Sequence, residues 1–175
     1  MVNGIADNLL HNIFNDLSVG LELYDKDGLM IDVNYSRLRS MGIKDKKDIL
    51  GHNLFNYTSF SDEIKEQIRK GETVRFVAKY DFDALRRLFP TYLSGTKYFE
   101  ITVSFVHNEK SEVTNYMVIT QDVTERVLWQ NKYDNLYEEA VRSKKELLES
   151  EQRMIHLIRQ NELVLNNINS GLAYI

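Results

Sequence analysis

The feature that most constrains this chain of 175 residues is a long stretch without helix breakers. No glycine or proline occurs from residue 122 until Gly171, and Pro90 is the single proline of the chain. Residues 122–165 are rich in Glu, Gln, Lys, Arg, Asn and Leu, which is the composition of a long helix. At 1.5 Å per residue, such a helix extends roughly 65 Å. A helix of this length cannot lie on one small domain, so the sequence predicts a compact domain followed by a free helix.

Apolar residues in this predicted helix recur at alternating spacings of four and three residues. The pattern is a heptad seam, typical of a coiled coil, and polar residues at 143, 150 and 161 interrupt it. Such polar positions lower stability but can fix the register, or allow two registers of similar energy. We expect the helix to pair with the same helix of a second chain. The predicted dimer seam consists of Trp129, Tyr133, Leu136, Ala140, Leu147, Met154 and Leu157.

The first part of the chain consists of short segments separated by turn signals. Helical spacing of apolar residues predicts an amphipathic helix over residues 6–17 and a second helix over 61–70. Alternation of apolar and polar residues predicts strands, of which the first pair is joined by an Asp27-Gly28 hairpin turn. The predicted strands lie at 21–23, 29–33, 74–81, 98–105 and 114–121. We expect an α+β fold with a five-stranded antiparallel sheet and small helices on one face.

Connections between these strands also carry local signals. Asn34 can cap a short helix, Tyr35 to Met41, which stops at Gly42. Residues 45–57 suggest two short helical turns, and residues 82–96 form a long connection. The apolar strand faces can enclose a small pocket, or their side chains can simply fill the core. The candidate pocket residues are Leu23, Phe76, Ala78, Phe99, Ile101 and Tyr116.

Three segments in this order and spacing resemble the PAS domain, the sensory fold of bacterial signalling proteins. YDKDGLMIDVN (24–34) resembles its opening hairpin, and KKDILGHNLFNY (46–57) resembles the region where a glycine precedes a short aromatic-containing helix. MVITQDVTER (117–126) resembles the last strand and the junction that begins an output helix. The resemblance covers about residues 6–126. It implies a PAS fold with an added N-terminal helix and a long C-terminal coiled-coil helix.

The resemblance also implies a function. We expect a non-catalytic sensory and dimerisation module of a tandem-PAS sensor histidine kinase, which relays ligand or partner state to downstream domains of a longer parent chain. The alternative is a ligand-free interaction module of another effector, such as a diguanylate cyclase or a transcription regulator. An enzyme in its own right is not expected, because no Ser-His-Asp constellation or glycine-rich phosphate loop is evident.

The predicted organisation has four parts: an N-terminal helix at 1–20, a sensor domain at 21–122, a linker helix at 123–165, and a further segment at 166–175. Residues 164–172 match residues 13–21 in their apolar positions and their glycine. We expect the last segment to be the truncated start of a second PAS domain, with chance similarity as the alternative.

The junction between sheet and helix consists of Asp122, Thr124, Glu125 and Arg126. Asp122 can cap the first free amides of the helix, and Glu125 can complete a capping box three residues later. The motif is then either only a good helix start or, in addition, the point at which a shift of the sheet tilts or rotates the helix.

Residues that would carry cofactor chemistry are mostly lacking. The chain has no cysteine, which excludes thiolate catalysis and cysteine-linked metal sites and, within the PAS resemblance, the flavin-adduct and hydroxycinnamoyl photoreceptor classes. His52 lies outside the helix that usually supplies a haem ligand, and His156 lacks the flanking residues of a phosphoacceptor. Asp25-Lys-Asp27-Gly28 departs from the calcium-loop pattern at the next two positions. We expect no metal and no cofactor, with an unidentified small-molecule ligand left open.

The charge balance limits the partners. With 26 acidic and 22 basic side chains, the net charge of −4 provides no basic surface for nucleic acid. No apolar run approaches the length that spans a bilayer, and the N-terminus lacks the features of a signal peptide. We expect a cytoplasmic segment without membrane contact, whose parent chain can be membrane-anchored elsewhere.

Overall fold

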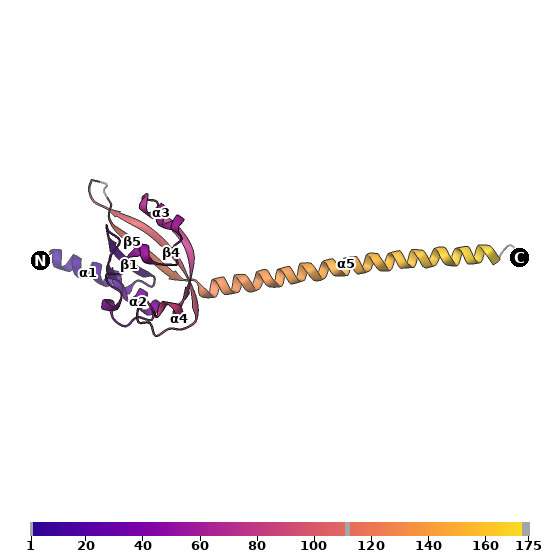
Figure 1. Cartoon of the computed structure of the whole chain (residues 1–175), viewed down its shortest axis with the longest axis horizontal. Coiled ribbons are helices and arrows are strands. Elements are labelled where there is room, and N and C mark those ends of the chain that lie inside the picture. The colour runs from indigo at the N-terminus through magenta and orange to yellow at the C-terminus, as the bar shows by residue number, and fades with distance from the viewer. Residues whose placement is uncertain (1, 111–112, 173–175) are drawn as a thin grey trace. The chain divides into compact units, whose positions relative to one another are not determined.

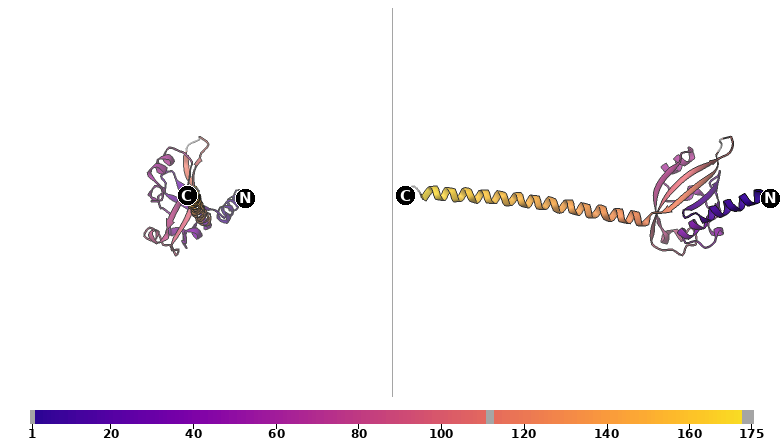
Figure 2. Two further views of the ribbon diagram at one scale, coloured as in Figure 1. Left: turned by 90° about the vertical axis from the view of Figure 1, so that its right-hand side faces the viewer. Right: turned by 180° about the vertical axis from the view of Figure 1, so that it is seen from behind.

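A computed structural model describes residues 2–110 and 113–172 of the chain. They divide into two compact units at the Glu125/Arg126 bond. The first unit contains a sheet and small helices, and the second is a single helix without a break (Figures 1 and 2). In order, the elements of the first half are α1 (Val2–Asp16), β1 (Gly20–Asp25), β2 (Met30–Val33), α2 (Tyr35–Met41), η1 (Lys46–Asp48), η2 (Leu54–Asn56) and α3 (Asp62–Arg69). The remaining elements are β3 (Val74–Asp81), α4 (Phe82–Leu85), β4 (Thr96–His107), β5 (Val113–Asp122) and α5 (Thr124–Leu172).

The five strands form one antiparallel sheet in the order β2-β1-β5-β4-β3. The predicted α+β fold with a five-stranded antiparallel sheet is therefore confirmed. The chain makes a hairpin, crosses the sheet through α2, η1, η2 and α3, and returns as three consecutive strands. Because the first and last strands pair in the middle, β1 and β5 place both the entry and the exit of the domain at the centre of the sheet.

Local sequence signals account for several element boundaries. The side chain of Asn34 accepts a hydrogen bond from the Arg37 amide at the start of α2, and Gly42 ends α2 with φ of 66°. A side chain at Gly42 would also collide with Leu93, whose Cγ lies 2.6 Å from the Cβ position. The turn between β1 and β2 uses Gly28 at φ 80°, and the Asp25 carboxylate accepts from the amides of Asp27 and Leu29. The Asp25 carboxylate therefore stabilises the hairpin turn.

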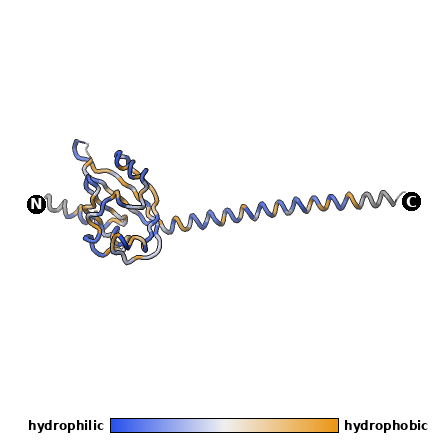
Figure 3. The backbone as a smooth tube through the Cα atoms, in the orientation of Figure 1, coloured by the Kyte–Doolittle hydropathy of each residue, from blue (hydrophilic) through white to orange (hydrophobic). Residues whose placement is uncertain are grey.

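The predicted connection at 82–96 contains the short helix α4, and its loop folds back onto the helical layer. The Thr91 hydroxyl donates to the carbonyl of Met41 at 2.6 Å, and Phe82 and Phe89 are buried in the core. The apolar core lies between the sheet and the small helices. Figure 3 shows hydrophobic and hydrophilic segments alternating along the backbone of this unit. A long loop with its own buried residues thus covers part of the domain.

Two observations concern the ends of the chain. The first helix begins at Val2 rather than at residue 6. Helix α5 continues through Gly171 to Leu172, where the predicted repeat would change from helix to strand as the first copy does at Gly20. Residues 173–175, the rest of the predicted repeat, lie outside the described part of the chain.

Candidate functional site

A charged pair lies in the core beneath β1. Glu22 and Tyr24 are alternate residues of β1 and point to the same face, and Arg37 reaches them from the first turn of α2. The Arg37 Nε donates to Glu22 Oε1 at 2.5 Å, and the Tyr24 hydroxyl donates to Glu22 Oε2 at 2.6 Å. Both charged residues are only 1% exposed. Because burial removes the hydration of both charges, each charge is stabilised mainly by the other.

Electrostatics favour the charged form of the Arg37 guanidinium and the neutral form of the Tyr24 phenol. Burial alone would lower the pKa of the Arg37 guanidinium, but the adjacent Glu22 carboxylate raises that pKa well above its ordinary value. Burial and the Glu22 charge both raise the pKa of the Tyr24 hydroxyl. The guanidinium also lies against two aromatic rings, 5.5 Å from the centroid of Tyr80 and 5.3 Å from that of Phe99.

Four polar atoms around this cluster are buried and have no hydrogen-bond partner. They are Arg37 Nη1, Tyr57 Oη, Ser59 Oγ and Thr120 Oγ1. The Tyr57 and Tyr24 phenols influence each other's pKa, yet they make no hydrogen bond of ordinary geometry. Burial is the main cause that raises the pKa of Tyr57, with the Glu22 charge as the next cause. Unpaired polar atoms are rare in protein interiors, so this concentration marks a candidate site.

Two of the residues with unpaired atoms, Tyr57 and Ser59, line a cavity of about 190 Å³. Its wall comes from the segment before α3, the end of β3, and α4 with the residues after it. The lining residues are Tyr57, Thr58, Ser59, Lys79, Tyr80, Asp81, Ala84, Leu85 and Leu88.

None of the six pocket residues predicted from the sequence lines this cavity. Ala78, Phe99 and Ile101 are buried in the core, and Phe76 and Tyr116 pack against it while partly exposed. Leu23 pairs with Met117 and alternates with the core-facing Glu22 and Tyr24, so it lies on the other face of the sheet. Its side chain therefore points away from the face that carries Glu22 and Tyr24. Alternation in the sequence assigns Leu21 and Leu23 to the core and Glu22 to the solvent. Glu22 faces the core instead, because Arg37 pairs with it there.

The residues that sequence reasoning missed carried a signal nonetheless. Arg37 is a charged residue that lies on the same short helix as the buried Leu38 and Met41, and Glu22 alternates with Tyr24 in a strand. Opposite charges on two neighbouring core elements indicate a buried pair once both elements are placed. No comparable sequence signal marked Ser59, because its burial depends on the loop around it.

The junction between sheet and helix is held by the first residues of β4. The Thr124 hydroxyl accepts from the Tyr98 amide at 2.9 Å, the Val123 amide donates to the Tyr98 carbonyl, and Lys97 Nζ lies 2.9 Å from Asp122. Partial burial alone would raise the pKa of Asp122, but hydrogen bonds from Thr124 and Lys97 bring that pKa below its ordinary value.

The predicted capping box at this junction is absent from the described contacts. Helix α5 begins at Thr124, two residues after Asp122, and the Asp122 carboxylate accepts from the amide and the hydroxyl of Thr124. Among the described hydrogen bonds, Glu125 makes no return bond to Asp122. It lies instead in the first turn of α5, where a negative charge favours the helix dipole. Arg126, the last predicted junction residue, is exposed and begins the second unit.

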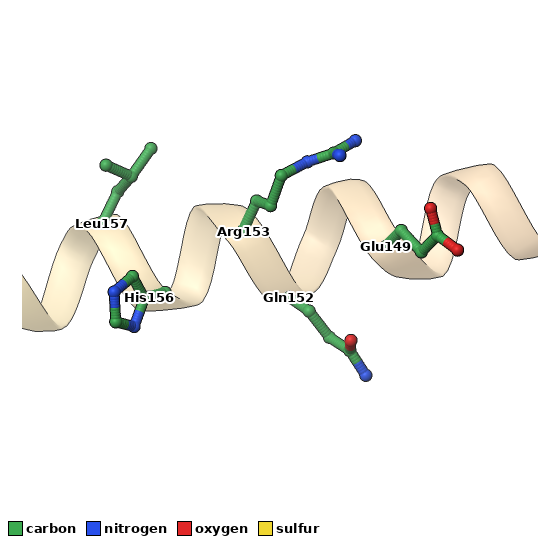
Figure 4. A pocket seen from close by; sticks show the side chains of 5 residues that line it. All are labelled: Glu149, Gln152, Arg153, His156 and Leu157. Carbon is green, nitrogen blue, oxygen red and sulfur yellow. The ribbon is translucent and has the colours of Figure 1, made fainter.

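The predicted seam of α5 is exposed along its length. Every large apolar residue of the seam is more than half exposed, for example Leu136 at 56% and Trp129 at 66%, and Ala140 is exposed as well. Figure 3 shows hydrophobic residues recurring among hydrophilic ones along the helix. A surface hollow is lined by Glu149, Gln152, Arg153, His156 and Leu157, all on α5. Figure 4 shows their side chains leaving one helix in different directions, so a single helix does not enclose the hollow.

Histidine and acidic residues do not form a metal site in the described part of the chain. The two ring nitrogens of His52 lie 3.0 Å from the Ile49 carbonyl and 3.3 Å from the Leu88 carbonyl. His52 therefore joins the 45–57 segment to the loop after α4. No helix among the described residues is long and apolar enough to cross a membrane.

Tyr24, Arg37, Phe99 and Ile101 are at most 1% exposed and lie in the core beneath the sheet.

The similarities of this chain to known proteins are similarities to solved structures. No protein-family model matches the sequence, and no curated protein matches it. A solved structure of an RNA-binding light-oxygen-voltage receptor is similar, with 22% identity, a TM-score of 0.62, and coverage of 77% of this chain and 38% of that protein. The chain thus spans well under half of that receptor.

Two PAS domains of solved structure are similar over nearly their whole length. One, from an HTR-like protein of Haloarcula marismortui, has 18% identity and a TM-score of 0.52, over 68% of this chain and 93% of that one. The other, from a two-component sensor histidine kinase, has 15% identity and a TM-score of 0.52, over 69% and 98%. Sheet order, helix placement and these similarities together show that the first unit of this chain has the PAS fold.

Proposed function

We propose that this chain is a sensory module that dimerises through α5 and relays the state of its PAS-fold domain to further domains of a signalling protein. The observation that carries the proposal is the exposed apolar seam of α5, which begins directly after a junction hydrogen-bonded to β4. An apolar seam of this length is unfavourable in water unless another helix covers it. In a parallel dimer, a second copy of the helix places the same seam residues at the same level along the helix axis. Each apolar position therefore packs against an apolar position of the partner.

The proposed parent protein is a sensor histidine kinase, and the chain itself is proposed to be non-catalytic. Support comes from the similarity to a PAS domain of a two-component sensor histidine kinase. Histidine 156 is not the proposed phosphoacceptor, because it lies in the middle of an otherwise ordinary coiled-coil sequence. A ligand-free interaction module is the second candidate, and the well-filled core beneath the sheet favours it.

Cysteine cross-linking tests the dimer, since the chain has no cysteine of its own and every cross-link reports an introduced residue. Single cysteines at the seam positions Leu136 and Leu147 are expected to form disulfide-linked dimers on mild oxidation. The matched controls are cysteines at Glu138 and Lys145, on the opposite face of the helix, which are expected to react much more slowly. Cross-links at both seam positions indicate a parallel pair, because an antiparallel pair brings identical residues together only near one crossing point.

Equal cross-linking on both faces would contradict the proposed seam. A strictly monomeric species at tens of micromolar in analytical ultracentrifugation would contradict the dimer altogether.

A further inference from the structure

The cavity of about 190 Å³ differs from an ordinary packing defect because two of its lining residues carry buried polar atoms without partners. Tyr57 Oη and Ser59 Oγ both belong to lining residues, and both atoms are buried and unpaired. Behind this wall lies Arg37, whose Nη1 is also unpaired and whose guanidinium stacks on the lining residue Tyr80. A buried polar atom without a partner is costly, so three in one neighbourhood point to a missing partner.

The chemistry of these atoms indicates what that partner supplies. The Arg37 Nη1 can only donate hydrogen bonds, and the Tyr57 phenol remains protonated because burial raises its pKa. Two carboxylates in the vicinity already accept hydrogen bonds: Glu22 from Arg37 Nε and the Tyr24 hydroxyl, and Asp81 from the amides of Asp83 and Ala84. The unmet need is therefore for an oxygen acceptor.

The rest of the wall sets the size and the character of the molecule. Ala84, Leu85 and Leu88 give one side an apolar surface, and the aromatic rings of Tyr57 and Tyr80 add flat contacts. Lys79 and Asp81 lie in the wall with opposite charges, and the Asp81 carboxylate accepts from the amides of Asp83 and Ala84 at the start of α4. A mixed wall of this kind favours a small, partly apolar molecule with one polar end.

We propose that this cavity binds a small molecule that presents a carboxylate or amide oxygen to Tyr57 and Ser59. The inference rests on the proposed sensory function and deepens it by naming the chemical class of the ligand. Arg37 reinforces the polar end from behind the wall, and its pair with Glu22 links the cavity to β1 and to α2.

Three molecules of nearly identical shape test the ligand class directly. Benzoate offers oxygen acceptors alone, benzamide offers an acceptor and a donor, and benzamidinium offers donors alone. Each is titrated into the whole chain labelled at the methyl groups of Ala84, Leu85 and Leu88, and binding is followed by methyl NMR. Benzoate and benzamide are expected to shift the cavity methyls with saturation, and benzamidinium is expected to leave them in place. Equal binding of all three, or no response to any of them, would overturn the proposal, the latter by indicating a cavity that holds water alone.

Conservative variants then assign the contact to the named atoms. Tyr57→Phe and Ser59→Ala each remove one oxygen without emptying the wall, and each is expected to weaken the binding of benzoate about three- to tenfold. Tyr92→Phe is the matched control, because Tyr92 is exposed and lies outside the cavity. Binding unchanged in both cavity variants would overturn the assignment.

A separate cross-linking measurement on α5 distinguishes failure of the proposed ligand site from failure of the proposed relay. Cross-linking of the Leu136→Cys variant is compared with and without saturating benzoate. Methyl shifts without any change in cross-linking support the cavity and contradict the relay, whereas a cross-linked dimer without methyl shifts supports the seam and contradicts the cavity.

Discussion

The PAS-fold unit and helix α5 use the same kinds of residue in opposite ways. In the first unit, even charged side chains such as Glu22 and Arg37 are buried, and they are paired. In the helix, even large apolar side chains such as Trp129 and Leu136 are exposed. A unit that buries its own apolar surface can fold alone, whereas the exposed apolar seam of α5 is covered only in the proposed dimer. Single substitutions are therefore expected to affect one region without the other.

The largest expected effect comes from breaking the buried charged pair. Arg37→Met leaves the Glu22 carboxylate buried without its counter-charge, and we expect the first unit to lose about 3–5 kcal/mol of unfolding free energy. Urea denaturation followed by near-ultraviolet circular dichroism measures this loss. The double variant Glu22→Leu with Arg37→Met removes both charges, and it is expected to recover most of the stability. A double variant no more stable than Arg37→Met would show that packing, rather than the unpaired charge, is responsible.

The seam gives the next effect, and it concerns association rather than the fold of the first unit. Leu136→Asp places a carboxylate at the seam of each helix, so we expect the dissociation constant of the proposed dimer to rise about 100-fold. Sedimentation equilibrium measures it. Glu138→Gln, on the other face, is the control and should change association little. An unchanged dissociation constant in Leu136→Asp would place the contact elsewhere.

Asn34 is expected to affect the first unit by a smaller amount. Its buried side chain accepts from the amides of Leu21 and Arg37 and donates to the carbonyls of Phe14 and Val19, so it joins α1, β1 and α2. Asn34→Ala leaves these groups unpaired, and we expect a loss of about 2–3 kcal/mol in urea denaturation. The control is Asn115→Ala.

Asn115 is half-buried and donates one hydrogen bond, to the Tyr24 carbonyl. A loss of about 1 kcal/mol or less is therefore expected for Asn115→Ala. Equal losses in the two variants would show that Asn34 acts only as a helix cap.

The smallest expected effect is a pH dependence at the junction. Because the pKa of Asp122 is lowered in the folded chain, its contribution to stability is present above the ordinary pKa of aspartate and is lost as the pH falls through the lower, folded value. The stability difference between the wild type and Asp122→Ala should therefore be present at pH 6 and should shrink as the pH falls below about 4. Urea midpoints over this range measure it, and a difference that stays constant would assign the whole effect to neutral hydrogen bonding.

Prediction from sequence succeeded where the pattern is local. The hairpin turn at Gly28, the cap at Asn34 and the long run without glycine or proline each depend on neighbouring residues, and the structure has the corresponding turn and helices. It did not indicate the face on which Leu23 lies or the residues that line the cavity, because strand alternation shows that two faces differ but not which face is covered. At β1 the charged residue faces the core, since Arg37 arrives from another element to pair with it.

The sequence by itself determined the element order, the five strands and the uninterrupted helix, because backbone propensity, turn chemistry and heptad spacing act over a few residues. The tertiary structure alone decided which polar atoms are buried together. Tyr57, Ser59 and Arg37 lie up to 22 residues apart in the chain, and only the fold brings Tyr57 and Ser59 to the cavity and Arg37 against the lining residue Tyr80. The strength of the electrostatic interactions and hydrogen bonds that a buried charge or hydroxyl makes depends on the groups around it in space. Those groups come from segments that are distant in sequence.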